Sequence, residues 1–424
     1  MQKTTAVLMA AAALTLAACG GGGGGGGGNG NGGGNGGGNG GGPALGDDAR
    51  RMVLADIADN VILPTLRDLD ADAAALATAV EAHASTGGAD NAALTAARNA
   101  WREASNSLQR AEVLQLGPAA SSGTGDPQPG AMDIRDQIYS YPDSNGCIVD
   151  NSAFADEDVD ASARLSAKGM DALEYLLFFE GANADCPPPE GVDLAAARAS
   201  YAAEVARFTA DQASLLLQEW EPSGDDFRGA FANAGDGSMT YNRPQDALDA
   251  LSLALFYVEK QTKDRKIACP AGIGASGLSC PGPDVTRVEY PNARASGSAL
   301  RANFETFRDV FQGVDGDMGI NTLLENIGRE DLVQDLNTAL AAALDLIDRI
   351  ENDDGGFEAA IEAISSSDAC SSAAGAAEDP AQAPTAPLAC ALQGRVKTVT
   401  TIFRADIVNA LSLATPQAAA GDND

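Results

Sequence analysis

The sequence predicts an all-α protein. Apolar residues recur at helical spacing along most of the chain, and no segment shows the alternating pattern of a half-buried strand. Aromatic residues make up only 5% of the chain while alanine is abundant, a composition that suits closely packed helices. With 424 residues, the chain is long enough for two domains.

The N-terminal segment is typical of an exported lipoprotein. Residues 1–18 form a signal peptide whose apolar run is too short to span a membrane as a mature helix. The lipobox-like residues 16–19 end in Cys19, which we expect to be the lipidated first residue of the mature protein. Because Gly20 follows instead of an aspartate, outer-membrane sorting is expected. Residues 19–43 include a glycine- and asparagine-rich tether that cannot bury apolar surface.

Helices are expected along the rest of the chain, bounded by capping residues, prolines and glycines. Asp90 is the expected N-cap of the second helix, and Pro64 is expected to kink or break the first. Residues 264–292 are interpreted as a long loop, and Pro222-Ser223-Gly224 as a domain boundary. The expected helices are 47–83, 90–116, 132–139, 163–179, 194–220, 244–263, 299–311, 331–350 and 388–413.

Six of the seven cysteines are expected to form disulfides, since Cys19 is assigned to the lipid anchor. Proximity along the chain favours pairs that close loops rich in proline, glycine, serine and alanine. No C-x-x-C spacing occurs, so a zinc site is not expected. The favoured pairs are Cys147–Cys186, Cys269–Cys280 and Cys370–Cys390.

The charge of the chain excludes some partners. Lys and Arg total 27 against 60 Asp and Glu, for a formal net charge of −33 at pH 7. Such a surface repels nucleic acid and anionic membrane. It attracts cations, although most acidic surfaces serve only solubility.

Residues 167–179 carry the chemistry around which the chain is organised. Their apolar residues predict a buried helix, and Gly169 predicts a helix start or a close backbone approach. Asp171 and Glu174 are three residues apart and share one mostly apolar face. If that face is buried, a cation, hydrogen bonds or a proton must compensate the carboxylates. The plainer alternative is that Asp171 caps a neighbouring helix and Glu174 reaches solvent.

Residues 169–174, Gly-Met-Asp-Ala-Leu-Glu, followed by an apolar run, resemble the G-x-H-x-x-E motif of the imelysin-like family. That family includes iron-regulated lipoproteins and homologues of insulin-cleaving membrane peptidases. Asp171 stands where the family has histidine. Three further segments resemble the family in the same order: the helix of Trp101 with its Gly-Pro end, the Tyr141-Pro142 segment, and the helix start near Ser296.

The resemblance implies two packed helical bundles, residues 44–222 and 223–424, with the motif near their interface. A faint similarity between residues 171–180 and 246–259 hints at a duplication. By resemblance, binding roles fall on four residues besides the motif carboxylates. Trp101 is otherwise a core residue, and Arg294 is either a partner of the carboxylates or an exposed loop residue. The four are Gly169, Trp101, Arg294 and Ser296.

The donor types favour a binding protein over an enzyme. Asp171 and Glu174 offer oxygen ligands, which suit iron as Fe³⁺ or another hard cation such as Ca²⁺ or Mg²⁺. Zinc hydrolysis needs histidine ligands, and the only histidine is His83, expected at a helix end where its cation meets the dipole. We therefore expect a lipoprotein of the cell envelope, exposed to the periplasm or the surface, that is connected with iron or metal uptake. Its expected partners are the membrane, through the anchor, and a metal or iron-bearing ligand. The alternatives are a metallopeptidase of the imelysin type and a degenerate scaffold that binds no metal.

Overall fold

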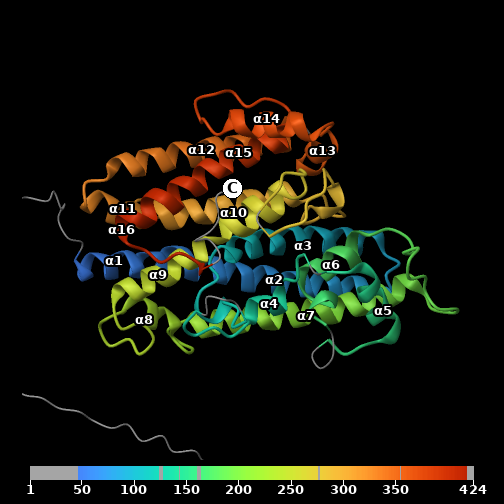
Figure 1. Ribbon diagram of the computed structural model, residues 1–424. Coiled ribbons are helices and arrows are strands. Elements are labelled where there is room, and N and C mark those ends of the chain that lie inside the picture. The colour runs from blue at the N-terminus through green and yellow to red at the C-terminus, as the bar shows by residue number, and fades with distance from the viewer. Residues whose placement is uncertain are drawn as a thin grey trace, which may run out of the picture. The chain divides into compact units, whose positions relative to one another are not determined.

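The computed structural model describes residues 46–123, 128–142, 144–159, 164–275, 277–353 and 355–417. Within these residues the regular structure is helical, with only isolated bridges in the 271–283 loop, so the all-α prediction is confirmed (Figure 1). The predicted signal peptide 1–18, Cys19 and the tether 19–43 lie outside the described residues.

The first helix passes through Pro64 without ending. Helix α1 (Asp47–Ile57) continues through a π-helical turn (Ala58–Ile62) into α2 (Leu63–Ala84). The N–H of Leu63 donates to the carbonyl of Ala58, five residues back, directly before a proline that has no N–H to donate. The expected distortion therefore takes the form of a widened turn inside one continuous helical segment.

A first group of helices packs around α2. Helix α3 (Asn91–Glu112) begins at Asp90, whose side chain accepts from the N–H of Ala92 at 2.8 Å, as predicted. Helix α7 (Leu194–Trp220) has the predicted bounds, and both α3 and α7 pack against α2. Three shorter helices pack against α7: α4 (Ile134–Ile138), α5 (Gly146–Ala155) and α6 (Gly169–Phe178).

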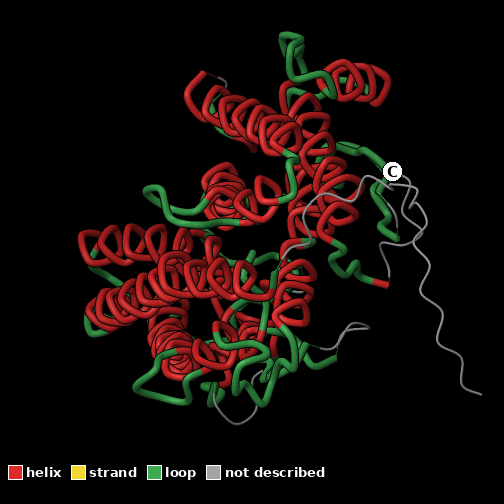
Figure 2. Tube along the Cα trace, turned by 90° about the vertical axis from the view of Figure 1, so that its left-hand side faces the viewer, coloured by secondary structure: helices red, strands yellow, loops and turns green. Residues whose placement is uncertain are grey.

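The second group packs around α10, α12 and α15, above the first group in Figure 1 and seen after a 90° turn in Figure 2. Helix α3 packs against α10 and joins the two groups. Two further π-helical segments occur here, Val258–Ala268 and Ile402–Ile407. The helices of this group are α10 (Ser296–Gln312), α11 (Ile320–Asn326), α12 (Glu330–Asp353), α13 (Phe357–Glu362), α14 (Ser367–Ala377), α15 (Leu388–Thr401) and α16 (Val408–Leu411). Helices α8 (Phe227–Ala232) and α9 (Pro244–Leu255) pack instead on α1.

The expected boundary at residues 222–224 is a turn between α7 and α8. The described residues nevertheless cluster as one unit, and α1 packs against α8 and α9 and against α11 of the second group. The division into domains 44–222 and 223–424 and the duplication stay predictions.

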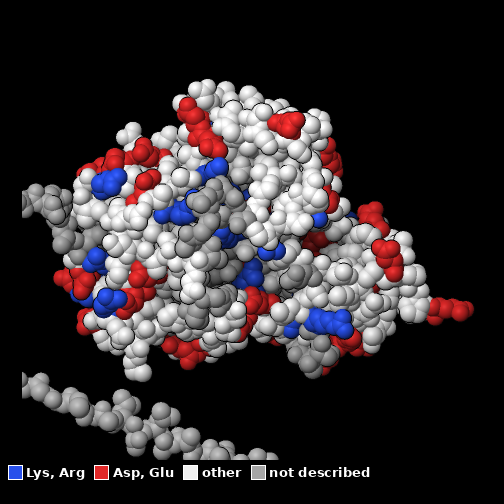
Figure 3. Space-filling model, viewed as in Figure 1, with Lys and Arg blue, Asp and Glu red and all other residues white. Residues whose placement is uncertain are grey.

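All three predicted disulfides are confirmed, with Cα–Cα distances of 5.5 Å for Cys147–Cys186, 4.9 Å for Cys269–Cys280 and 5.2 Å for Cys370–Cys390. Disulfides of this number are typical of proteins that fold outside the cytoplasm. No helix among the described residues is long and apolar enough to cross a membrane. On the visible face, acidic side chains are scattered among Lys and Arg rather than gathered in one patch (Figure 3).

Replacing Cys370 and Cys390 together by alanine should lower the free energy of unfolding by about 3 kcal/mol, because the bond restricts the unfolded chain across a separation of 20 residues. Urea denaturation of the full-length protein measures the change. Reduction of the wild type before denaturation should destabilise it at least as much. A loss below about 1 kcal/mol in the double variant would contradict this account of the bond.

Candidate functional site

The motif helix α6 begins at Gly169 because its backbone passes very close to the preceding segment. Gly169 has a φ of +79°, and a Cβ at this position would lie 2.5 Å from the carbonyl oxygen of Ile138. A side chain would therefore be strained by both the dihedral angle and the contact. The predicted close approach is present, and it places α6 directly against residues 138–141.

Asp171 fastens α6 to this preceding segment. Its Oδ2 accepts hydrogen bonds from the N–H groups of Ser140 (2.7 Å) and Tyr141 (3.0 Å) and from the Ser140 hydroxyl (3.2 Å). Its Oδ1 is buried and has no hydrogen-bond partner among the described residues. Since the side chain is only 5% exposed, Asp171 points inward, as the apolar face predicts.

Glu174 fastens α6 to the segment that leads into α10. Its Oε1 accepts from the N–H groups of Asn292 (2.7 Å) and Ala293 (2.8 Å), and its Oε2 accepts from the Asn292 side-chain amide (2.8 Å). These partners lie 118 and 119 residues further along the chain. Glu174 is 4% exposed, so it does not reach solvent, and it ties the two groups of helices together.

Both motif carboxyl groups have raised pKa values. Burial raises the pKa of Asp171 to about 7, with the Glu289 charge adding to the effect and the Ser140 hydrogen bonds opposing it. Burial likewise raises the pKa of Glu174 to about 7 against the hydrogen bonds from Asn292 and Ala293. Each group therefore exchanges its proton near neutral pH.

A cavity of about 160 Å³, which we call the motif cavity, adjoins both carboxylates. One wall comes from α6 and the segment that Asp171 holds, and the other comes from the segment that Glu174 holds. The cavity is lined by Tyr141, Pro142, Ser144, Gly146, Asp171, Glu174, Tyr175, Thr286, Val288, Glu289, Pro291 and Asn292.

A buried ionic network lies next to the motif cavity. The Lys266 Nζ is 3.0 Å from the Glu289 Oε1 and donates to the Gln109 Oε1 at 2.6 Å, and Tyr139 donates its hydroxyl to Glu289. Lys266 is 2% exposed and Glu289 5%. The pairing offsets much of the cost of burying two charges.

A second pair, partly buried Arg135 with buried Glu112, makes three guanidinium–carboxylate hydrogen bonds of 2.6–3.0 Å. Sequence reasoning missed Lys266, Glu289, Arg135 and Glu112. Lys266 and Glu289 fall inside the segment predicted as a loop, and their partners are distant in sequence. Nothing in the one-dimensional pattern distinguishes such buried charges from exposed ones.

The other predicted binding residues lie around the motif rather than in the cavity wall. Trp101 is fully buried, donates its indole N–H to the carbonyl of Met170 at 3.0 Å and packs edge-on against Tyr290. Ser296 is buried, and its hydroxyl accepts from the N–H of Tyr290 at 3.1 Å. Arg294 instead pairs with Glu362 at 3.4 Å, both about half exposed, and makes no ion pair with either motif carboxylate.

His83 lies in the last turn of α2, as expected, but its chemistry differs from the expectation. It is 6% exposed, and burial, followed by the nearby Arg98 charge, lowers its pKa. The lowered pKa opposes the charged form of the ring, so it weakens the expected interaction of a histidine cation with the helix dipole.

The motif carboxylates do not fit a coordinated metal ion as they are arranged. Six hydrogen bonds from N–H and O–H donors occupy Asp171 Oδ2 and both Glu174 oxygens, which leaves Asp171 Oδ1 as the one unpartnered oxygen of the two residues. Across the described ranges, no three His, Cys, Asp or Glu residues are grouped so that they could hold a metal. A hard cation usually takes six or more oxygen ligands.

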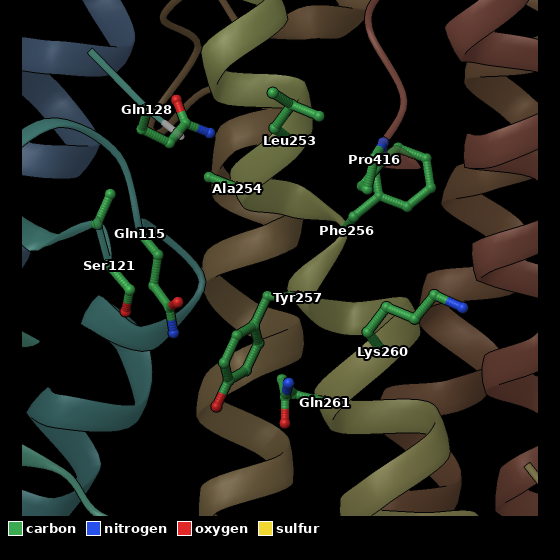
Figure 4. Close-up of a pocket in the computed structure, with 11 residues that line it drawn as sticks. Gln115, Ser121, Gln128, Leu253, Ala254, Phe256, Tyr257, Lys260, Gln261 and Pro416 are labelled. Carbon is green, nitrogen blue, oxygen red and sulfur yellow. The ribbon is translucent and has the colours of Figure 1, made fainter. Parts of the chain in front are cut away.

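Another cavity, of about 180 Å³, lies between the end of α3 and residues 253–261 (Figure 4). Gln115, Ser121 and Gln128 line one side, and Phe256, Lys260 and Pro416 line the other. Tyr257 stands between this cavity and the buried network, since the Lys266 Nζ lies 5.1 Å from its ring centre. The motif carboxylates are not part of its wall.

The fold and the site define an all-α protein in which two buried carboxylates of one helix hold the walls of an interhelical cavity. The chain belongs to the imelysin family: the model of this family, Peptidase_M75 (Imelysin), matches residues 62–383. The resemblance inferred from the sequence is thus confirmed.

Two solved structures share the fold. An imelysin-like protein from Psychrobacter arcticum 273-4 aligns with a TM-score of 0.62 at 15% identity, over 88% of this chain and 98% of that one. A "putative iron-regulated protein A precursor" from Parabacteroides distasonis ATCC 8503 aligns with a TM-score of 0.58 at 16% identity, over 88% of this chain and 95% of that one. None of the curated proteins compared with the chain matches it.

The raised pKa values predict that wild-type stability contains a term that falls as the pH rises from about 4 to about 7. In this window the native carboxyl groups hold a proton that the unfolded groups have lost, so the unfolded state binds fewer protons. Each group contributes a fall of about 1.4 kcal/mol per pH unit within the window.

Asp171→Asn should abolish the pH-dependent contribution of Asp171 to the free energy of unfolding. The amide oxygen can still accept hydrogen bonds from Ser140 and Tyr141, but the amide does not titrate. The difference in the free energy of unfolding between the wild type and the variant isolates the contribution of Asp171, because His83 and the other groups with shifted pKa values are present in both proteins. Urea denaturation at pH 5 and pH 7 should give a difference that changes by about 2–3 kcal/mol between the two pH values. A difference independent of pH would show that Asp171 does not titrate there.

Proposed function

We propose that this chain is a ligand-binding protein of the cell envelope, anchored through a lipidated Cys19 and connected with iron uptake. The observation that carries the proposal is the motif cavity, whose two walls are held to α6 by Asp171 and Glu174. Cavities between packed helices, lined by a few convergent polar groups, are typical of ligand sites in helical proteins.

The envelope location is supported by independent features. The lipobox-like residues 16–19 precede a glycine-rich tether, and the three disulfides suit an oxidising compartment. The link with iron comes from the name of the Parabacteroides relative and from the family resemblance of the motif. For this chain, the link with iron is a proposal.

Binding is favoured over peptidase chemistry by the donor set at the motif. The position of the family histidine is Asp171, and the sole histidine, His83, lines a different cavity beside Gly88 and Asn91. A zinc peptidase needs nitrogen ligands and a carboxylate free to act as a general base. Glu174 would have to give up its hydrogen bonds with Asn292 and Ala293 to take that role.

We therefore infer that Asp171 and Glu174 position the walls of the motif cavity. This differs from the direct cation contact expected from their oxygen donors. It also accounts for the replacement of the family histidine by a residue that can accept two backbone hydrogen bonds at once. A ligand in the cavity would meet Tyr141, Thr286 and the other lining groups.

Growth of the source organism under iron limitation tests the proposal. A strain without the gene should grow more slowly, and the wild-type gene should restore growth. Cys19→Ser should release the protein from the membrane fraction and fail to restore growth. Glu174→Ala should also fail because it frees one cavity wall, whereas Asp68→Asn, which alters an exposed carboxylate of α2, should restore growth.

Immunoblots must show equal amounts of each variant before growth is compared. A deletion strain that grows normally without iron would remove the proposed link. Full membrane retention of Cys19→Ser would remove the lipid anchor. Chelator-sensitive peptide cleavage that is lost in Glu174→Ala would replace the binding protein by the metallopeptidase.

A further inference from the structure

A basic cavity of about 280 Å³ shares a wall with the motif cavity. The shared residues are Tyr141, Pro142 and Thr286. The other side carries two guanidinium groups, Arg265 and Arg287. Two cations in one cavity stand out in a chain whose formal net charge is −33.

The two arginine side chains differ in the hydrogen-bond and ion-pair partners that the described residues give them. Arg287 pairs with Asp284 at 3.3 Å and donates to the carbonyl of Ser279 at 2.7 Å. Arg265 is partly buried, and the described residues supply its side chain with no ion pair and no hydrogen-bond acceptor; its Nε is fully buried without a partner. A guanidinium has five N–H donors, so this site has donors available for an anion.

Arg265, which lines the basic cavity, belongs to the π-helical segment Val258–Ala268. The next residue, Lys266, enters the buried network, while Arg265 lines the basic cavity. π-Helical turns are rare and occur frequently at functional sites. The nearby hydroxyl of Tyr141 donates to the carbonyl of Arg287 at 2.9 Å. Burial, followed by the Glu289 charge, raises the pKa of Tyr141, and the two guanidinium charges oppose this rise.

The rest of the lining selects an organic anion over an inorganic one. Pro142, Leu278 and the Cys269 side of a disulfide give the cavity an apolar portion next to the cations. A phosphate or sulfate ion would leave most of 280 Å³ unfilled. The planar fork of a guanidinium matches the geometry of a carboxylate.

We propose that the basic cavity binds the carboxylate of a small organic acid or of a peptide C-terminus, with Arg265 as its principal partner and the apolar wall holding the adjoining carbon groups. This site goes beyond the proposed function and requires neither the lipid anchor nor a link with iron. Failure of either proposal therefore leaves the other open to its own test.

Titration calorimetry on the purified full-length protein in detergent tests this site. The probes are succinate, citrate and benzoate, inorganic phosphate, and a hydrophobic tripeptide with a free or an amidated C-terminus. At least one carboxylate should bind with a Kd below about 1 mM. Arg265→Gln should weaken that binding by about tenfold or more, as expected for hydrogen bonds to a charged group. The affinity of Arg265→Lys for the carboxylate should lie between those of the wild type and Arg265→Gln.

Arg349→Gln is the matched control, because it removes the same charge from an exposed position of α12. Since the described residues supply the Arg265 side chain with no partner, Arg265→Gln should keep the melting temperature without ligand, which separates lost binding from lost folding. Stronger binding of the free than the amidated tripeptide identifies a peptide C-terminus as the source, and binding of the small acids alone identifies a free acid.

Three results would overturn the proposal. The first is that no carboxylate binds the wild type up to about 10 mM. The second is equal binding to the wild type and Arg265→Gln. The third is phosphate binding as tight as that of the best carboxylate.

Discussion

The structure depends on the burial of Glu174, which pairs with no cationic side chain among the described residues. A buried carboxyl group is costly unless hydrogen bonds or a proton compensate it. Glu174 obtains three N–H donors from Asn292 and Ala293, on a segment 118 residues further along the chain. Hydrogen bonds to charged groups contribute about 1.5–3 kcal/mol each. Meeting this requirement fixes α6 against the entry to α10, and so fixes one wall of the motif cavity.

The same requirement explains the other wall and the network behind it. Asp171 takes two backbone N–H groups from residues 140–141, and the close approach at Gly169 brings them within reach. Lys266 pairs with Glu289, and Arg135 pairs with Glu112. The motif carboxyl groups therefore rely on dipoles and protons, in agreement with their raised pKa values.

Much of the fold follows from local rules and was predictable. The bounds of α7 agree because Asp193 caps its start and Pro222 follows its end, and the disulfides join cysteines that are near in sequence. The inward face of Asp171 and Glu174 also follows from helical spacing. The pairing of Lys266 with Glu289 and Gln109 was not predictable, because these partners are distant in sequence. No pattern in the sequence marked residues 258–268 as π-helical. For the same reason, the partners of Glu174 could not be found from the motif.

Native-state hydrogen exchange at the four amides that face the motif carboxylates tests the central claim most directly. If Asp171 and Glu174 hold the cavity walls, the N–H groups of Ser140, Tyr141, Asn292 and Ala293 are protected in the wild type. Asp171→Ala should selectively release the first two, Glu174→Ala the last two, and added Fe³⁺, Ca²⁺ or Mg²⁺ should change none of them. Exchange as fast as in exposed loops, or loss of protection when a cation is added, would show that these carboxylates serve a ligand instead of the backbone.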